Sequence, residues 1–154
     1  MPFDFCANAR GRDEDSEACR RKLQGVAQGP DIGDSRLLRG SAAEGIAAEY
    51  LEARGIAVLA RNVRCKAGEL DLVCRDGDVL VIVEVRQRRG HDFGGALASV
   101  TRHKQRKIIC ATRFLLCASP QWRAHRLRFD VIGVQGLPDR APEFIWVKDA
   151  FRAA

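Results

Sequence analysis

The sequence lacks several motifs that would assign it to a familiar enzyme class. It has no glycine-rich phosphate loop, because the stretch GGALASVTRHK does not end in the Gly-Lys-Ser/Thr of a P-loop. It also has no Gly-x-Ser-x-Gly elbow of an α/β-hydrolase. A dehydrogenase or kinase interpretation is therefore without support, and a serine-hydrolase interpretation lacks its usual motif.

Metal-thiolate and membrane signals are absent from the sequence as well. The six cysteines form no Cys-x-x-Cys pair, and the three histidines complete no zinc spacing. Cys110 and Cys117 stand seven residues apart in a helical pattern, so both are expected to face the core. No apolar run is long enough to cross a membrane, and the first residues lack the apolar segment of a secretory signal. The sequence predicts a cytoplasmic protein with reduced thiols.

Charge is what the chain has in abundance, and it is unevenly placed. The 154 residues suffice for one domain, and 46% of them are hydrophobic, which allows a real core. The formal net charge is +6, which favours anionic partners, nucleic acid above all. From Arg86 to Lys107 there are seven basic residues and one acid, an excess equal to that of the whole chain. Solubility accounts for the net charge alone, but its concentration indicates a binding surface.

Hydrophobic periodicity predicts a mixed α/β fold in which helices cover a sheet. The expected order is a helix over 41–55, strands over 56–64, 69–75 and 79–86, a helix over 101–118 and a strand over 127–134. Ser41 and Glu44 fit a capping box at the start of the first helix, and Gly55 fits the position just after its end.

The domain is expected over residues 37–137. The charged, glycine-broken residues 1–36 predict a disordered or loosely held tail. Residues 138–154 are expected to form a C-terminal extension with a short strand or a helical turn.

Three carboxylates stand in sequence that should form a sheet interior. Glu69 and Asp71 lie in GELDLVCR, and Glu84 lies in the apolar run VLVIVEV. A two-residue turn at Asp76-Gly77, the strongest hairpin signal in the chain, would place Glu69 opposite Glu84. The same turn brings Asp71 and Arg86 to that face, since facing residues share a side of the sheet.

The predicted register depends on the turn length. In this register Asp71 faces Ile82 and Arg75 faces Asp78. A four-residue turn keeps the pairing, whereas a three-residue turn would slip it by one and move Glu84 to the other face.

Facing carboxylates repel each other, so a cation must offset their charge. One candidate is a protein cation, Arg86 or another arginine, in a structural ion pair. The other is Mg²⁺ or Mn²⁺, which takes oxygen ligands and keeps several waters. The residue pattern leaves both alternatives open.

A resemblance to known proteins begins at these residues. Asp71 followed by Glu84-Val85-Arg86 resembles the PD-(D/E)xK signature of the restriction-endonuclease-like superfamily, whose αβββαβ core is similar to the predicted order. The segments AAEGIAAEYLEARGIAVLARNVRCKAGELDLV, VIVEVRQRR, FGGA and RFDVIGV together resemble the YraN family of uncharacterised bacterial proteins. The match runs from about residue 40 to residue 134.

The resemblance implies roles for individual residues. Asp71 and Glu84 match the metal-binding acids, and Val85 would add a backbone carbonyl ligand. Glu69 belongs to the family's GExD segment. Glu44 matches a helical glutamate that reaches the metal or its water, with the capping box as the equally good structural explanation. In the RFD segment a structural pair of Arg128 with Asp130 is favoured.

The departure from the motif is Arg86, which stands where the superfamily usually has lysine. Arginine stays protonated, so it cannot act as a general base, although it can neutralise charge on a phosphate. The resemblance thus implies a Mg²⁺- or Mn²⁺-dependent endonuclease with a D…ExR site. The alternatives are a catalytically inactive nucleic-acid-binding protein and a protein-interaction module on the same scaffold.

Nucleic acid, DNA in particular, is the expected partner, and a homodimer would follow only by analogy with nucleases that cut two strands. Arg102, Lys104 and Arg106 are expected on the outward face of the second helix. A solvated helix face is the alternative explanation for these charges. The expected phosphate contacts are Arg61, Arg64, Arg88, Arg89, Arg102, Lys104 and Lys107.

Overall fold

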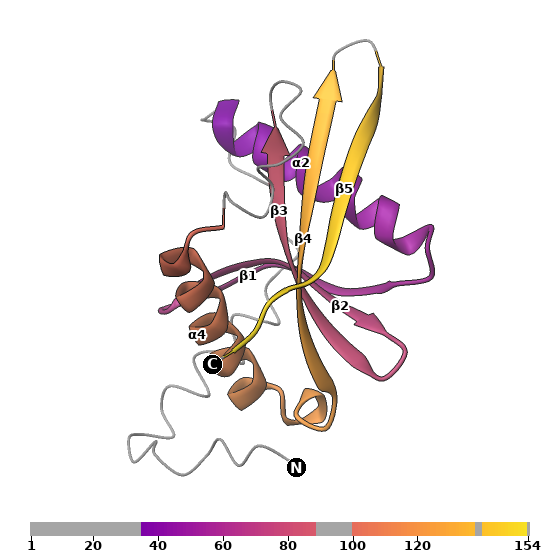
Figure 1. Cartoon of the computed structure of the whole chain (residues 1–154). Coiled ribbons are helices and arrows are strands. Elements are labelled where there is room, and N and C mark those ends of the chain that lie inside the picture. The colour runs from indigo at the N-terminus through magenta and orange to yellow at the C-terminus, as the bar shows by residue number, and fades with distance from the viewer. Residues whose placement is uncertain (1–34, 89–99, 138–139, 154) are drawn as a thin grey trace.

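The computed structural model describes residues 35–88, 100–137 and 140–153 (Figure 1). The elements are α2 (Ser35–Glu52), β1 (Ala57–Cys65), β2 (Gly68–Asp76), β3 (Val79–Arg88), α4 (Arg102–Ala118), the 3-10 helix η1 (Pro120–Trp122), β4 (Arg126–Leu137) and β5 (Arg140–Phe151). The predicted order of helix, three strands, helix and strand is confirmed, and β5 is added to it. Most of the predicted tail, residues 1–34, lies outside the described residues.

All five strands form one mixed sheet in the order β1-β2-β3-β4-β5. The first three strands are antiparallel neighbours, β3 and β4 are parallel, and β5 returns antiparallel to β4. The connection from β3 to β4 passes through α4, as a parallel pair requires. The C-terminal extension supplies β5, a 12-residue strand where a short strand or helical turn was expected.

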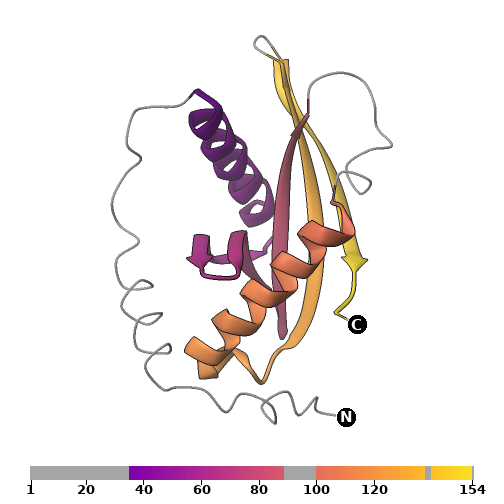
Figure 2. The same cartoon turned by 90° about the vertical axis from the view of Figure 1, so that its left-hand side faces the viewer.

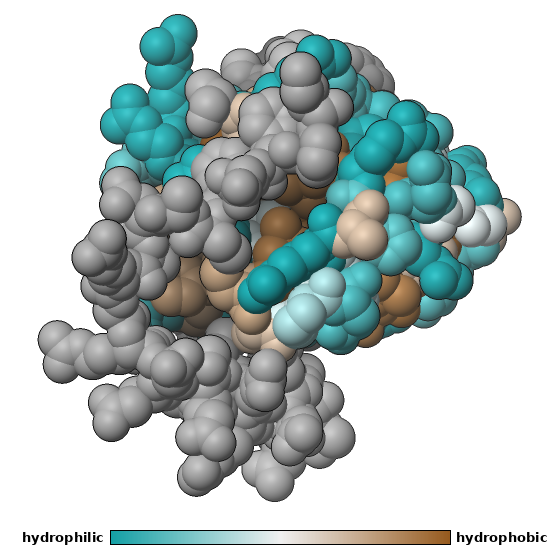
Figure 3. Space-filling model, turned by 90° about the horizontal axis from the view of Figure 1, so that it is seen from below, coloured by the Kyte–Doolittle hydropathy of each residue, from teal (hydrophilic) through white to brown (hydrophobic). Residues whose placement is uncertain are grey.

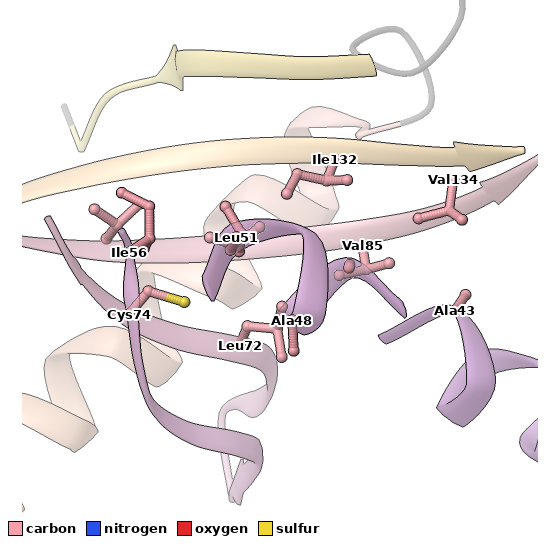
Figure 4. Packing of buried hydrophobic residues seen from close by; sticks show 12 residues of the cluster. Ala43, Ala48, Leu51, Ile56, Leu72, Cys74, Val85, Ile132 and Val134 are labelled. Atoms are coloured by element: carbon pink, nitrogen blue, oxygen red, sulfur yellow. The ribbon is translucent and has the colours of Figure 1, made fainter. Parts of the chain in front are cut away.

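The two helices cover opposite faces of the sheet, as the alternation along β3 shows. Val81, Val83 and Val85 belong to the core cluster under α2, part of which Figure 4 shows. Leu80 and Ile82 belong to the cluster under α4. Figure 2 shows both helices against the strands. Successive strand residues point to opposite faces, so β3 is buried on both sides over this stretch.

The alternation breaks in β2 at Asp71. Leu72 and Cys74 pack in the α2-side cluster, whereas Leu70 and Val73 pack in the α4-side cluster. In a regular strand Leu70 would share a face with Leu72. The sheet therefore changes its facing at Asp71, and this places Asp71 where side chains from both layers can approach it.

The two ends of α2 differ in how well the sequence predicted them. The helix begins at Ser35, so Ser41 is an interior residue and the predicted capping box is wrong. Gly55, with φ of +80°, confirms the predicted end signal. The N–H of Ile56 donates to the Leu51 carbonyl at 3.1 Å and the N–H of Gly55 to that of Glu52 at 3.0 Å, which is the Schellman pattern.

The β2–β3 hairpin differs from the predicted register by two residues. Asp76 pairs with Val79, and the loop consists of Gly77 and Asp78. Gly77 takes the left-handed φ of +61°, at the first loop position, where a type II′ turn requires glycine. A slip of two residues keeps every side chain on its predicted face, so the expected convergence of acids survives the error in the turn.

Helix α4 follows Thr101, whose hydroxyl accepts a hydrogen bond from the Lys104 N–H at 3.3 Å. Ile108 and Leu115 are buried as predicted. Cys110 and Cys117 are exposed, so the prediction that they face the core is wrong. Each stands two positions beyond a core residue, which is about 200° around a helix.

Figure 3 shows the molecule from below, with hydrophilic residues over much of the described surface and hydrophobic areas between them. The exposed large hydrophobic residues of the described chain are Leu59, Phe114 and Leu127. Within the described residues, no helix combines the length and the apolar character that crossing a membrane demands.

Candidate active site

Asp71 of β2 stands opposite Glu84 of β3 in the interior of the sheet. The pairing of the two strands runs from Asp76 and Val79 to Leu72 and Val83, and the next position along brings Asp71 to Glu84. Asp71 is 9% exposed and Glu84 is 3% exposed. The sequence predicted that both acids share one face of the sheet, but it paired Asp71 with Ile82 and Glu84 with Glu69.

Just beyond the last paired residues of β2 and β3, the Asp71 carboxylate replaces a backbone carbonyl as the hydrogen-bond acceptor. Its Oδ2 accepts a hydrogen bond of 2.8 Å from the backbone N–H of Val85. This bond satisfies a buried amide and fixes the carboxylate beside Glu84. A backbone role for Val85 was expected through its carbonyl; the contact that the structure shows uses its N–H.

Two protein cations meet one oxygen of Glu84. Arg86 Nη2 lies 3.3 Å from Glu84 Oε1, and Lys104 Nζ lies 3.1 Å from the same oxygen. Lys104 was expected to face outward from the helix, but its side chain is only 32% exposed and reaches the sheet. Lys104 lies in the first turn of α4, and its long stem lets the ammonium reach Glu84 of β3.

The two cations do not fully offset the buried negative charge. Burial, followed by repulsion from Asp71, raises the pKa of Glu84 to about 7 in spite of Lys104 and Arg86. Burial also raises the pKa of Asp71, against the opposing effect of the Val85 hydrogen bond. A site in which both carboxyl pKa values stay raised gains stability from further positive charge.

Two further acids flank this pair. Glu44 of α2 is half-buried, and its pKa is raised by burial and then by Asp71, while a hydrogen bond from the Asn62 side chain lowers it. Glu69 is held by Arg64, whose Nε lies 3.0 Å from Glu69 Oε1 in a largely exposed pair. The charge of Glu69 raises the pKa of Asp71, and the charge of Asp71 raises the pKa of Glu44.

The acids of the site offer the oxygen ligands that a hard divalent cation prefers, but only two of them face each other. Asp71 and Glu84 offer facing carboxylate oxygens, which Mg²⁺ and Mn²⁺ prefer, and Mg²⁺ is commonly held by one or two carboxylates with water completing its shell. Among the described residues, however, no group of three or more His, Cys, Asp or Glu side chains converges on one ion position. The residues therefore fit an ion held by two carboxylates, with Glu44 and Glu69 outside its direct reach.

Exposed basic residues lie on β1 and on α4, the helix whose Lys104 contacts Glu84. Arg61 and Arg64 are exposed on β1, and Arg102 and Lys107 are exposed on α4. Helix α4 lies close to the start of β2, where a Cβ on Gly68 would be 3.5 Å from Lys107 Cβ. Arg88 ends β3, and Arg89 lies outside the described residues.

The pair predicted in the RFD segment is a structural anchor elsewhere in the sheet. Asp130 is fully buried and accepts from Arg128 Nε at 2.9 Å, from Trp146 Nε1 at 3.0 Å and from the Asp149 N–H at 3.0 Å. These bonds tie β5 to β4.

Two contacts of the site, made by Lys104 and Asn62, could not be predicted from the sequence. Lys104 was expected to contact nucleic acid, and no pattern in the sequence indicated its contact with Glu84. The hydrogen bond from Asn62 to Glu44 was not predicted either. A signal for Asn62 exists, since asparagine is the residue that best tolerates a left-handed backbone after glycine.

The fold defines a class. An α/β chain with a five-stranded mixed sheet and helices on both faces is consistent with the restriction-endonuclease-like core. Comparison with known proteins agrees with the YraN resemblance: the model of the uncharacterised protein family UPF0102, the YraN family, matches residues 43–134. The chain belongs to this family.

Its relatives cover most of the chain and are nearly the same length as the matched region. The UPF0102 protein of Pseudomonas putida strain GB-1 is 47% identical over 112 residues, which are 73% of this chain and 91% of that protein. The UPF0102 protein of Pseudomonas savastanoi pv. phaseolicola is 44% identical over 117 residues, with shares of 76% and 95%. That of Stutzerimonas stutzeri strain A1501 is 44% identical over 114 residues, with shares of 74% and 94%. The names of these relatives state a family and no activity.

Proposed function

We propose that this protein is a divalent-metal-dependent nuclease that hydrolyses phosphodiester bonds in nucleic acid, DNA in particular. The observation that carries the proposal is the buried, facing pair of Asp71 and Glu84, held where β2 and β3 stop pairing. Burying two facing carboxylates costs stability unless positive charge offsets them, and a bound divalent ion would supply that charge. Family resemblance adds the PD-(D/E)xK pattern at these positions.

Asp71 and Glu84 are the residues that would hold Mg²⁺ or Mn²⁺. Such an ion, when bound, supplies a Lewis acid for the phosphate and lowers the pKa of water. Arg86 and Lys104, which both contact Glu84 Oε1, are placed to neutralise charge on a phosphate beside the carboxylates. The buried Nε of Arg86 has no hydrogen-bond partner among the described residues, so a donor is left for a phosphate oxygen.

Exposed cations on β1 and α4 support binding of nucleic acid near these two elements. Arg61, Arg64, Arg102 and Lys107 are exposed on the two elements that flank the acids. Phosphate contacts of this kind position a nucleic acid without reading its sequence. The charges therefore fit a nuclease with little base preference.

The test is a cleavage assay with Mn²⁺ on branched, duplex and single-stranded DNA and on RNA. Wild type and Glu49→Gln, a matched change of an exposed glutamate on α2, are expected to give products, whereas Glu84→Gln is expected to give none. Products that persist undiminished in Glu84→Gln would come from a contaminant. Binding of nucleic acid without any cleavage by wild type would contradict the nuclease and leave a binding protein on this scaffold.

A further inference from the structure

Strand β1 contains a backbone feature that the proposed function does not use. Asn62 has a φ of 51° in the middle of a strand, one of two non-glycine residues with positive φ in the described chain. The left-handed conformation costs an L-residue roughly 1–2 kcal/mol, least for asparagine. A strained residue inside an edge strand calls for a structural gain elsewhere.

At Asn62 the side chains of β1 stop alternating regularly between the two faces of the sheet. Ala60 and Val63 both pack in the α4-side cluster, although residues three apart in a regular strand point to opposite faces. Opposite them, Leu70 and Val73 of β2 do the same. The change of face in β1 thus coincides with the one at Asp71 in β2.

The side chain of Asn62 gains a partner from this conformation. It hydrogen-bonds the carboxylate of Glu44, a residue of α2 that covers the other face of the sheet. Since a carboxylate only accepts, the amide NH₂ is the donor. The bond orients a half-buried acid whose pKa is raised more by the charge of Asp71 than by that of Glu69.

Arg64 and Asn62, the two β1 residues that contact Glu69 and Glu44, differ in charge. Arg64 forms an ion pair with Glu69 and so neutralises it, whereas Asn62 is a neutral amide and leaves the charge of Glu44 in place. Glu44 is thus oriented without being cancelled. It remains available to attract a cation or to accept a proton from its water.

We propose that Asn62 is a positioning residue of the Asp71–Glu84 centre, which holds Glu44 as a third acid acting on the divalent ion through a water molecule. This inference rests on the proposed function and deepens it, because Glu44 lies on a different layer from the other two acids. The ion would then be bound by carboxylates of β2 and β3 and, through water, by the Glu44 carboxylate of α2, which Asn62 of β1 holds in place.

The test measures Mn²⁺ binding by isothermal titration calorimetry, with nucleic acid absent. Asn62→Gly keeps the left-handed backbone and removes the amide, since glycine adopts positive φ freely. Asp149→Gly is the matched control, because Asp149 has a φ of 50° and lies on β5. Asn62→Gly and Glu44→Ala are each expected to weaken Mn²⁺ binding about tenfold or more, the scale for residues that orient a metal's ligands. Asp149→Gly is expected to bind as wild type.

A double-mutant cycle separates positioning from a general loss of stability. If Asn62 acts only through Glu44, the double variant Asn62→Gly/Glu44→Ala binds Mn²⁺ as weakly as Glu44→Ala alone. Additive losses of Mn²⁺ affinity in the double variant, or wild-type Mn²⁺ affinity in Asn62→Gly, would overturn the inference. If Glu84→Gln still loses Mn²⁺ binding in that case, the proposed function stands without it. Absence of Mn²⁺ binding by wild type itself would contradict the proposed function, and the inference with it.

Discussion

Asp71 and Val85 are joined by a 2.8 Å hydrogen bond from the Val85 N–H to the Asp71 carboxylate, across two strands that stop pairing at this point. The bond makes the carboxylate a substitute for the missing strand partner. It keeps Asp71 opposite Glu84 while the change of face in β2 opens the position to α2. One acid therefore serves both the sheet and the candidate centre.

The stability of the metal-free protein should fall as pH rises through the range in which Glu84 titrates. The pKa of Glu84 is about 7 in the folded protein, against 4.5 as its ordinary value. The folded state thus binds a proton more tightly than the unfolded state, so the stabilisation is complete below pH 4.5 and lost as pH passes 7. The loss is at most roughly 3 kcal/mol.

Urea unfolding in EDTA at pH 5 and pH 8 measures this effect. Wild type should lose unfolding free energy between the two pH values, and Glu84→Gln should lose clearly less. An equal loss in both proteins would show that Glu84 is not the titrating group. Asp71, whose pKa is also raised, accounts for part of any remaining slope.

Lys104→Met should move metal binding and cleavage in opposite directions. The change removes one of two cations on Glu84 Oε1, so a competing charge disappears and Mn²⁺ affinity should rise by roughly threefold to tenfold. Cleavage should fall roughly 100-fold, because a positive charge beside the phosphate is lost. Lys148→Met, at an exposed lysine over the Trp146 ring, should change neither. A parallel fall in both quantities would mean that Lys104 supports the fold rather than the phosphate.

Removing exposed cations from α4 should weaken DNA binding and lessen its dependence on salt. The double variant Arg102→Ala/Lys107→Ala changes two exposed residues of α4, and the slope of log K against log salt should fall by about 2 if each contacts one phosphate. The control is Lys148→Ala/Arg152→Ala, two exposed cations on or next to β5. Fluorescence anisotropy over a salt series measures both slopes, and equal slopes would place the nucleic acid elsewhere.

Asp130→Asn should destabilise the fold without touching the centre. Asp130 is fully buried and accepts from Arg128, Trp146 and the Asp149 N–H, so removing its charge leaves Arg128 without its buried partner. The expected cost is about 3–5 kcal/mol in urea unfolding. Asp78→Asn, at an exposed ion pair with Arg126, should change stability little. A wild-type midpoint for Asp130→Asn would show that the network does not hold β5.

Much of the fold could be predicted because local signals agreed with the tertiary structure. Gly55 and Thr101 mark the two helix boundaries, and apolar periodicity gave the strands. The hairpin turn was displaced by two residues, yet the face of Asp71 and Glu84 was right because side chains alternate with a period of two. The start of α2 was wrong because Ser41 and Glu44 satisfy a capping pattern inside a helix that begins at Ser35.

The parts of the site that could not be predicted depend on contacts between distant segments. Lys104 looks like one of many exposed cations until α4 is packed against the sheet, where its side chain reaches Glu84. Asn62 is an ordinary polar residue until its φ is known. The change of face at Asp71 leaves no trace in the hydrophobic pattern, because Leu70, Asp71 and Leu72 are all buried.

The most direct test of the central claim is a crystal structure of the protein soaked in Mn²⁺, with anomalous data collected near the manganese edge. The account predicts an anomalous peak within coordination distance of both the Asp71 and the Glu84 carboxylates, with Lys104 or Arg86 drawn away from Glu84. Absence of a peak, with both cations still on Glu84, would contradict it and make the acidic pair a structural ion-pair network.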